Sequence, residues 1–260
     1  MNPLTPFWDL IDHAEAQAAA YALVAVRLSA LMVFAPVLNS PAIAPRIKAA
    51  LVLAMSILIA PLVRFHGDAT LTVASVLSEL SVGIVFGLSL AIVSEMVVFA
   101  SSLIGMEFSF SLVNLIDPVS QVETPVMGQL LGWITVLVLL GAGLHRTLIA
   151  AVLRSFQVVP LGHATFGASS AAELVHLAGG IFLAGVQLAS PVLAAGLAVE
   201  ITVALVGKLA PHLPANILSV PLKTIVSYVV LVAALALWPR FLEHRFLVML
   251  QAAERMVTAT

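Results

Sequence analysis

The feature that most limits how this chain can fold is the length of its uncharged apolar runs. Twenty-two uncharged residues lie between Glu123 and Arg146, and 26 lie between Glu173 and Glu200. About 20 residues of α-helix cross the hydrocarbon core of a bilayer. Both runs are therefore long enough to form membrane-spanning helices, and we predict an all-α, polytopic, membrane-associated fold.

The composition excludes the main classes of soluble protein. Charged residues are 9% of the 260-residue chain, against roughly 25% in an ordinary soluble domain. Hydrophobic residues are 62%, and the mean hydropathy is +1.14. So few charges cannot cover the surface of a soluble enzyme or a disordered linker. A nucleic-acid binder would need a basic stripe, whereas this chain has 11 Lys and Arg against 13 Asp and Glu.

The remaining apolar runs are short for lone membrane spans. Fifteen uncharged residues separate Lys48 from Arg64, and 16 separate Lys223 from Arg240. Prolines and glycines mark the connections, the last of them at Pro211, Pro214 and Pro221. We predict one domain over residues 1–260 with about six hydrophobic helical regions, some of them kinked or re-entrant hairpins: 18–35, 48–63, 72–106, 126–158, 171–207 and 222–239.

The distribution of Lys and Arg predicts the orientation. The first 17 residues carry neither, and they lack the basic start of a secretory signal. The tail carries Arg240, Arg245 and Arg255, so the N-terminus is expected outside and the C-terminus in the cytoplasm. This orientation needs an odd number of crossings. Either one of the six regions does not cross, or the short ones are re-entrant, or a helix is miscounted.

The tail, residues 239–260, is predicted to form an amphipathic helix. Its apolar residues recur at helical spacing between charged ones, at Leu242, Phe246, Leu250, Ala253 and Val257. The apolar face could lie on the membrane or against a partner, and the sequence does not decide between them.

The sequence carries none of the common motifs for catalysis or cofactor binding. The chain has no cysteine, no HExxH pair and no phosphate loop, since Thr202 and Leu209 occupy required positions around Gly207-Lys208. We therefore expect no enzymatic activity, no cofactor and no metal site.

Charges within the apolar regions are costly and need an explanation. Arg27 lies about nine residues from either end of its run, where a charge costs roughly 2.5–3.5 kcal/mol on insertion scales. Glu79, Glu95, Glu107 and Glu200 are candidate partners for it. A proton or ion path is one interpretation; we favour buried structural charges, at Arg27, Glu95, Glu107 and Glu200.

Two glycine pairs offer small faces for close helix packing. They are Gly83-xxx-Gly87 and Gly128-xxx-Gly132. Such pairs predict tight packing without identifying a dimer.

The stretch from Gly105 to Pro118 is the most unusual part of the sequence. A long apolar region changes here into small, aromatic and hydroxyl residues, and then into Asp-Pro. Irregular backbone at membrane depth is tolerated only where protein buries it or water lines it. The stretch is therefore a candidate gate, the alternative being an ordinary helix end. The candidate gate residues are Gly105, Phe108, Phe110, Leu112, Val113, Asn114, Asp117 and Pro118.

These motifs together resemble the FliR/SctT family of type III export-gate proteins. The stretch from Gly105 to Pro118, followed by Pro125-Val126-Met127-Gly128-Gln129, is similar to the central signature of the family. Further pieces agree in order along nearly the whole chain: Arg27-Leu28, Pro45-Arg46-Ile47-Lys48, His145, Ser155-Phe156, Pro160-Leu161-Gly162, Ala210-Pro211-His212-Leu213 and Pro221-Leu222-Lys223. The chain departs from the family at Glu107 and Ser109, where glutamine and glycine are usual. The flagellar branch fits better than the injectisome branch.

The resemblance implies a non-enzymatic channel component of the flagellar basal body in the bacterial inner membrane. It would conduct unfolded rod, hook and filament subunits for flagellum assembly. It implies FliP-like and FliQ-like gate subunits as partners, with FlhB-like and FlhA-like export proteins, in a helical assembly. The Gly105–Pro118 stretch would be the plug that closes the channel.

A proton-coupled secondary transporter is the alternative function. It would use Glu95, Glu107 and Arg27. The inverted repeats common in such transporters were not found in the sequence.

Overall fold

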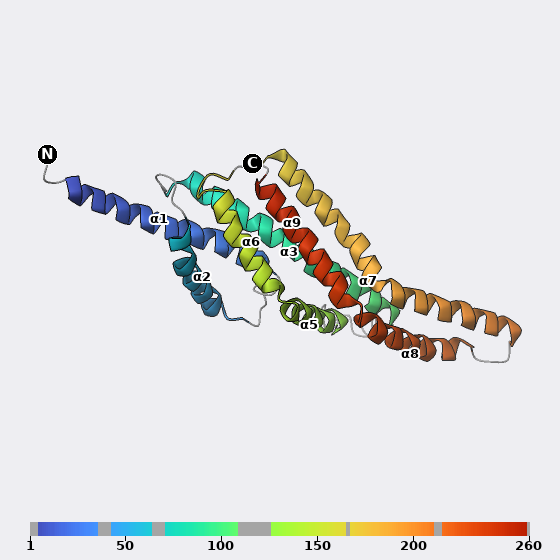
Figure 1. The fold of residues 1–260 in the computed structure, drawn as a ribbon. Helices are drawn as coiled ribbons and strands as arrows, with labels where there is room; N and C mark the ends of the chain where they lie inside the picture. The colour runs from blue at the N-terminus through green and yellow to red at the C-terminus, as the bar shows by residue number, and fades with distance from the viewer. Residues whose placement is uncertain are drawn as a thin grey trace, which may run out of the picture. The chain divides into compact units, whose positions relative to one another are not determined.

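The computed structural model describes residues 5–35, 43–63, 71–108, 126–164, 167–210 and 215–258. Every regular element among these residues is a helix, which confirms the predicted all-α class (Figure 1). In chain order they are α1 Thr5–Phe34, α2 Pro45–Ile59, the short 3-10 helix η1 Ala60–Leu62, α3 Val73–Glu107, α5 Val126–Gly141, α6 Leu144–Val158, α7 Ala168–Leu209, α8 Ala215–Leu235 and α9 Trp238–Thr258.

Within the part of the chain that the structure describes, four helical segments are long and apolar enough to cross a membrane. They are Gln17–Phe34, Pro45–Leu62, Val73–Glu107 and Ser170–Leu209. Two bent pairs of helices, Met127–Gly141 with Leu144–Val158 and Ser219–Leu235 with Trp238–Thr258, raise the number to six if each pair forms one span. The prediction of about six hydrophobic regions, some of them kinked, is therefore confirmed.

The predicted connections need one correction, at Pro221, and two predicted regions gain detail. Helix α1 begins at Thr5, and its apolar part, Gln17–Phe34, coincides with the predicted region 18–35. The region 126–158 is two helices bent by 67°, because Gly143 adopts a φ of +72° that ends α5 and starts α6. Pro221 lies inside α8 and does not separate helices. A proline inside a helix is tolerated in membrane proteins when neighbouring groups satisfy the carbonyl that it frees.

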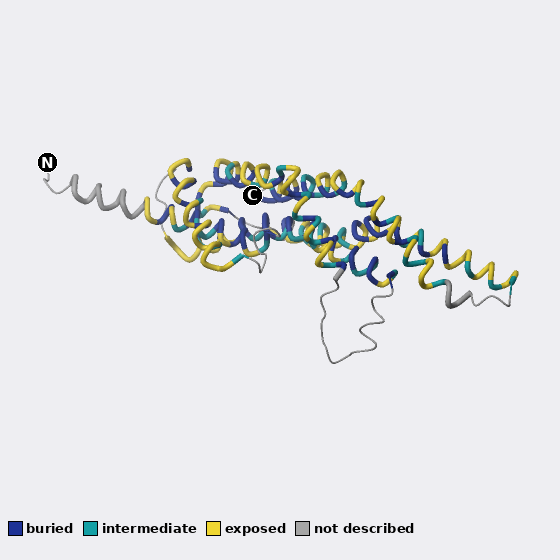
Figure 2. Tube along the Cα trace, turned by 90° about the horizontal axis from the view of Figure 1, so that it is seen from below, coloured by how far each residue is buried: buried dark blue, intermediate teal, exposed yellow. Residues whose placement is uncertain are grey.

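The chain divides into two compact units. Unit 1 comprises Met1–Ile92, Leu144–Leu177 and Phe246–Thr260, and unit 2 comprises Val93–Gly143 and Ala178–Arg245. Along most helices one face is buried and the other exposed (Figure 2).

In unit 1, two glycines of α3 allow a close approach to α1. A Cβ on Gly87 would lie 2.7 Å from the Cβ of Phe34, and one on Gly83 would lie 2.5 Å from the Cβ of Ala30. The prediction of tight packing at this pair is confirmed, and the packing lies within the chain. No described atom lies within 4 Å of a Cβ built on Gly132.

In unit 2, α7 packs on the C-terminal half of α3. A Cβ on Gly185 would lie 2.6 Å from the ring of Phe99, which itself meets Phe182 edge to face at 5.1 Å. Ala189 and Val192, on the same face of α7, are completely buried. Small residues on α7 therefore allow close contact between the two helices.

The apolar stripe of α9 faces the interior of the chain. Its five predicted members are all buried, whereas Arg240, Glu243 and Arg255 are exposed. The apolar face that could have lain on a membrane or a partner is thus covered by the chain itself.

Candidate functional site

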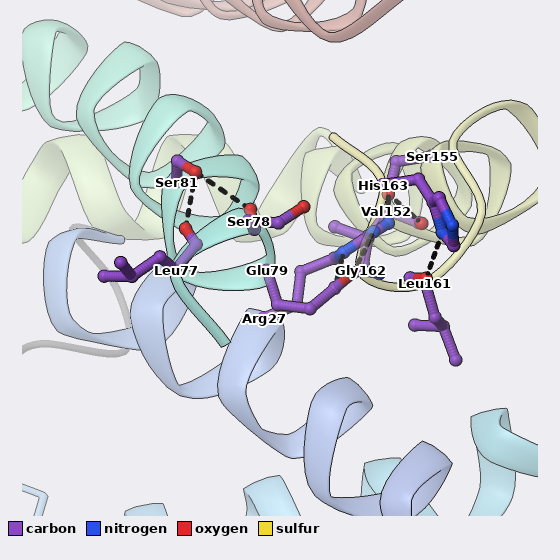
Figure 3. Close-up of polar contacts among 10 residues, drawn as sticks. All are labelled: Arg27, Leu77, Ser78, Glu79, Ser81, Val152, Ser155, Leu161, Gly162 and His163. Atoms are coloured by element: carbon purple, nitrogen blue, oxygen red, sulfur yellow. Dashed lines mark hydrogen bonds and ion pairs between the residues drawn. The ribbon is translucent and has the colours of Figure 1, made fainter. Parts of the chain in front are cut away.

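A buried ion pair joins α1 to α3 in unit 1. The side chains of Arg27 and Glu79 are 1% and 0% exposed. Nε of Arg27 donates a hydrogen bond to Oε2 of Glu79 at 2.6 Å, and Nη2 donates to Oε1 at 3.0 Å (Figure 3). This two-point geometry between guanidinium and carboxylate is the strong form of the interaction.

Groups from α6 and the turn after it complete the pair. Nη1 of Arg27 donates to Oγ of Ser155 at 3.0 Å, and this hydroxyl donates to the carbonyl oxygen of Val152 at 2.7 Å. The backbone N–H of Gly162 donates to Oε1 of Glu79 at 2.8 Å. The guanidinium carbon of Arg27 lies 4.1 Å from the ring centroid of Phe156, a cation–π contact. We call Arg27, Glu79, Ser155 and Gly162 the unit 1 ion cluster.

The position of Gly162 in this cluster requires a glycine. Its φ of +78° is in the left-handed region, which residues with a Cβ rarely adopt. A Cβ would also lie 2.8 Å from the Cβ of Ser75. Because only glycine fits, the turn can bring its N–H against the Glu79 carboxylate.

The unit 1 ion cluster has the properties of a structural site. All three guanidinium nitrogens donate to protein acceptors, and both carboxylate oxygens accept. Of the four carboxylates considered as partners for Arg27, the structure pairs it with Glu79. Such a network fixes the geometry of three helices.

Two of the predicted buried charges are exposed in this chain. Glu95 lies on the exposed side of α3, and the Glu200 side chain is 55% exposed on α7. The prediction placed these charges inside a helical assembly, so their burial there stays a prediction.

A second ion cluster lies where α3 ends in unit 2. Lys223 of α8 forms an ion pair with Oε1 of Glu107 at 3.1 Å and a second pair with Oε1 of Glu200. Glu107 is 14% exposed, and its carboxylate lies against Gly196 of α7, where a Cβ would displace it. We call Glu107, Glu200 and Lys223 the unit 2 ion cluster. It holds one cation and two carboxylates.

An aromatic contact strengthens the same junction. Phe108, the residue after α3, stacks on Tyr228 of α8 with ring centroids 4.1 Å apart and planes inclined by 22°. The last turn of α3 is therefore attached to α8 by an ion pair and by a ring stack.

The structure describes two of the predicted gate residues. Gly105 lies in the last turn of α3, and Phe108 is buried directly after it. The other six, Phe110, Leu112, Val113, Asn114, Asp117 and Pro118, lie outside the described residues.

Some residues of the two clusters and of the ring stack beside them carried no signal for their role in the sequence. Ser155, Gly162 and Lys223 belong only to motifs that resemble the family, and Tyr228 belongs to none of the motifs described above. Among the described residues, no three His, Asp or Glu side chains lie so that they could hold a metal ion.

Comparison with known proteins gives one family and several relatives. Residues 18–249 match the family described as "Bacterial export proteins, family 1". The chain is similar to the flagellar biosynthetic protein FliR of Pectobacterium carotovorum subsp. carotovorum, with 27% identity over 224 residues that cover 85% of this chain and 86% of the relative. It is also similar to FliR of Escherichia coli (strain K12), with 25% identity and the same coverage. FliR of Caulobacter vibrioides is 26% identical over 83% of this chain and 88% of the relative.

Proposed function

Because the chain belongs to the bacterial export proteins of family 1, we propose that it is a channel component of the flagellar type III export gate. The family match over residues 18–249 is the observation that carries this proposal, and it agrees with the non-enzymatic, helical membrane character of the chain. The similar proteins are named flagellar biosynthetic protein FliR, which supports the flagellar branch. Its cargo would be unfolded rod, hook and filament subunits.

The proposed assembly contains several partners. FliP-like and FliQ-like subunits would surround this chain in the gate, with FlhB-like and FlhA-like proteins beside them and membrane lipid outside. The location would be the flagellar basal body in the inner membrane, with the C-terminus in the cytoplasm. The long exposed apolar faces support this arrangement, since only 17% of the candidate span Ser170–Leu209 is buried within the chain.

We also propose that the Gly105–Pro118 stretch closes the channel. An apolar constriction excludes ions by dewetting and can still be displaced by a passing chain. The stretch contains bulky apolar residues at Phe108, Phe110, Leu112 and Val113 beside glycine and serine. The attachment of Glu107 and Phe108 to α8 supports the proposal, because a plug that moves repeatedly needs a fixed point from which to return.

The transporter alternative is less well supported. Of the three residues that it would use, Arg27 forms an ion pair with Glu79 and Glu107 forms one with Lys223. The third, Glu95, is exposed. A proton path would need carboxylates that can lose and regain a proton in turn.

Co-expression with the neighbouring genes tests the assembly. A tagged chain should purify with FliP-like and FliQ-like subunits in a complex of fixed mass by native mass spectrometry. A chain that transports a small solute when purified alone would support the transporter instead.

Deletion of residues 110–115 tests the plug. The complex should assemble, and cells should take up a normally excluded solute or conduct ions. Lys223→Gln, which removes the cation of the unit 2 ion cluster, should give a smaller leak. Lys208→Gln, which changes an exposed lysine of α7, is the matched control and should give none. An assembled deletion variant as tight as wild type would exclude the plug assignment.

A further inference from the structure

The outward face of α6 is basic. One side of this helix is buried through Leu144, Ala151, Val152, Ser155 and Phe156. On the opposite side Arg146, Ala150 and Arg154 follow one another at successive turns, and all three are exposed. We call these three residues the α6 basic face.

Nothing described in the chain neutralises these two arginines. No carboxylate of the described residues lies within ion-pair distance of Arg146 or Arg154. The sequence itself has no Asp or Glu between Glu123 and Glu173. The described part of the chain therefore supplies no counter-charge to them, which leaves this face available to carboxylates of a neighbouring molecule.

The depth of α6 relative to the candidate membrane spans restricts what can cover the α6 basic face. Ser155, the neighbour of Arg154, bonds to Arg27, which lies well inside the candidate span Gln17–Phe34. An arginine exposed to acyl chains at such a level costs roughly 2.5–3.5 kcal/mol. Acyl chains are therefore a poor neighbour for the α6 basic face.

The number and kind of the charges favour a protein over lipid headgroups. Recognition of an anionic lipid surface typically uses a cluster of about four to eight cations. The α6 basic face has two, both arginine, which is the residue suited to fixed two-point pairing with carboxylates at interfaces. The two arginines are eight positions apart, or about 12 Å along the helix, and the small Ala150 between them lets another backbone approach.

We propose that the α6 basic face binds a helix of a neighbouring gate subunit that carries two carboxylates seven or eight residues apart. This inference rests on the proposed function, because it assumes a multi-subunit gate. It adds the face used and the charge pattern of the partner.

Two variants of the co-expressed complex test the charge requirement. Arg146→Glu with Arg154→Glu should reduce the gate subunits that co-purify by about tenfold or more, since it opposes like charges across the contact. Arg146→Lys with Arg154→Lys keeps the charges and should retain most of the complex. If the chain carrying two glutamates binds as much partner as wild type, the proposal is wrong.

A photo-crosslinker identifies the partner directly and does not depend on a destabilised variant. Benzoylphenylalanine at Ala150 should crosslink to one gate subunit, in a helical peptide with the predicted carboxylate spacing. Exchange of those carboxylates for arginine should restore binding of the chain with two glutamates. The same crosslinker at Thr258, exposed on α9, is the control.

The other outcomes are distinct. A crosslink to a second copy of this chain, or to a peptide without carboxylates, overturns the inference. The absence of any protein crosslink also overturns the inference. This holds both if the glutamate variant loses bound anionic lipid and if the face is covered by water. Failure of the wild-type chain to recover any gate subunit would instead reject the proposed function.

Discussion

Arg27→Leu should destabilise the protein by removing half of a fully buried ion pair. The variant leaves the Glu79 carboxylate 0% exposed, with the N–H of Gly162 as its remaining donor in the unit 1 ion cluster. Breaking a buried pair from one side typically costs about 3–5 kcal/mol, because the other charge stays buried without compensation. For a chain of this size each kcal/mol lowers the thermal midpoint by about 2–4 °C, so the expected shift is about 6–20 °C.

A second substitution distinguishes an unpaired charge from a simple loss of packing. Glu79→Gln in the Arg27→Leu background removes the unpaired carboxylate and keeps an oxygen that can accept from Gly162. The double variant should therefore be more stable than Arg27→Leu alone. Its residual cost is about 1–3 kcal/mol, from the hydrogen bonds that are lost. The two substitutions should be strongly non-additive in a double-mutant cycle.

The assay is the amount of assembled complex in membranes, together with the thermal midpoint of the purified complex. Arg255→Leu, at an exposed arginine of α9, is the control and should change neither quantity. Normal assembly of Arg27→Leu with a selective loss of export would refute the structural role of the ion pair. Additive effects in the cycle would show that the penalty is not an unpaired charge.

Three further predictions follow from glycine geometry and charge. Gly83→Ala should destabilise the protein by about 1–3 kcal/mol, because the added Cβ would meet Ala30 and the Arg27 backbone. Gly132→Ala adds a Cβ that meets no described atom, so it should be neutral or stabilising in the same thermal assay. Gly162→Ala should lower the thermal midpoint more than Gly143→Ala, since both positions have positive φ but only the first has a Cβ clash; equal shifts would contradict this. A reporter active only in the cytoplasm should be active after Thr260 and inactive before Met1, and the opposite pattern would reverse the predicted orientation.

The helices could largely be predicted from the sequence, because their apolar runs are long and their ends carry turn residues. The break at Gly143 was missed, since a glycine within an apolar run resembles the many glycines that continue a membrane helix. At Pro221 the error is the opposite one, because a break was predicted there and the helix continues through the proline. Whether a glycine or proline interrupts a helix depends on neighbouring groups that are distant in sequence.

The two ion clusters show a similar limit. The cost of burying Arg27 predicts that a partner exists, but it cannot select Glu79 among four candidates when the contact spans 52 residues. The environment of Glu107 could not be predicted either, because Lys223 lies on a helix more than 100 residues away in the sequence. Charge indicates which residues need a partner, and only the packing of helices determines which partner they meet.

The sequence separation within the unit 1 ion cluster also constrains how the protein is made. A ribosome adds roughly 5–20 residues per second, so the 52 residues from Arg27 to Glu79 take about 3–10 s. Ser155 follows Arg27 by 128 residues, and its hydroxyl emerges later still. During this interval α1 has no described counter-charge for its arginine. We expect the nascent helix to stay at the translocon or at the bilayer surface, and to enter its final position only when α3 arrives. Biogenesis of this chain should therefore depend more strongly on the insertion machinery than that of a variant whose first helix is uncharged.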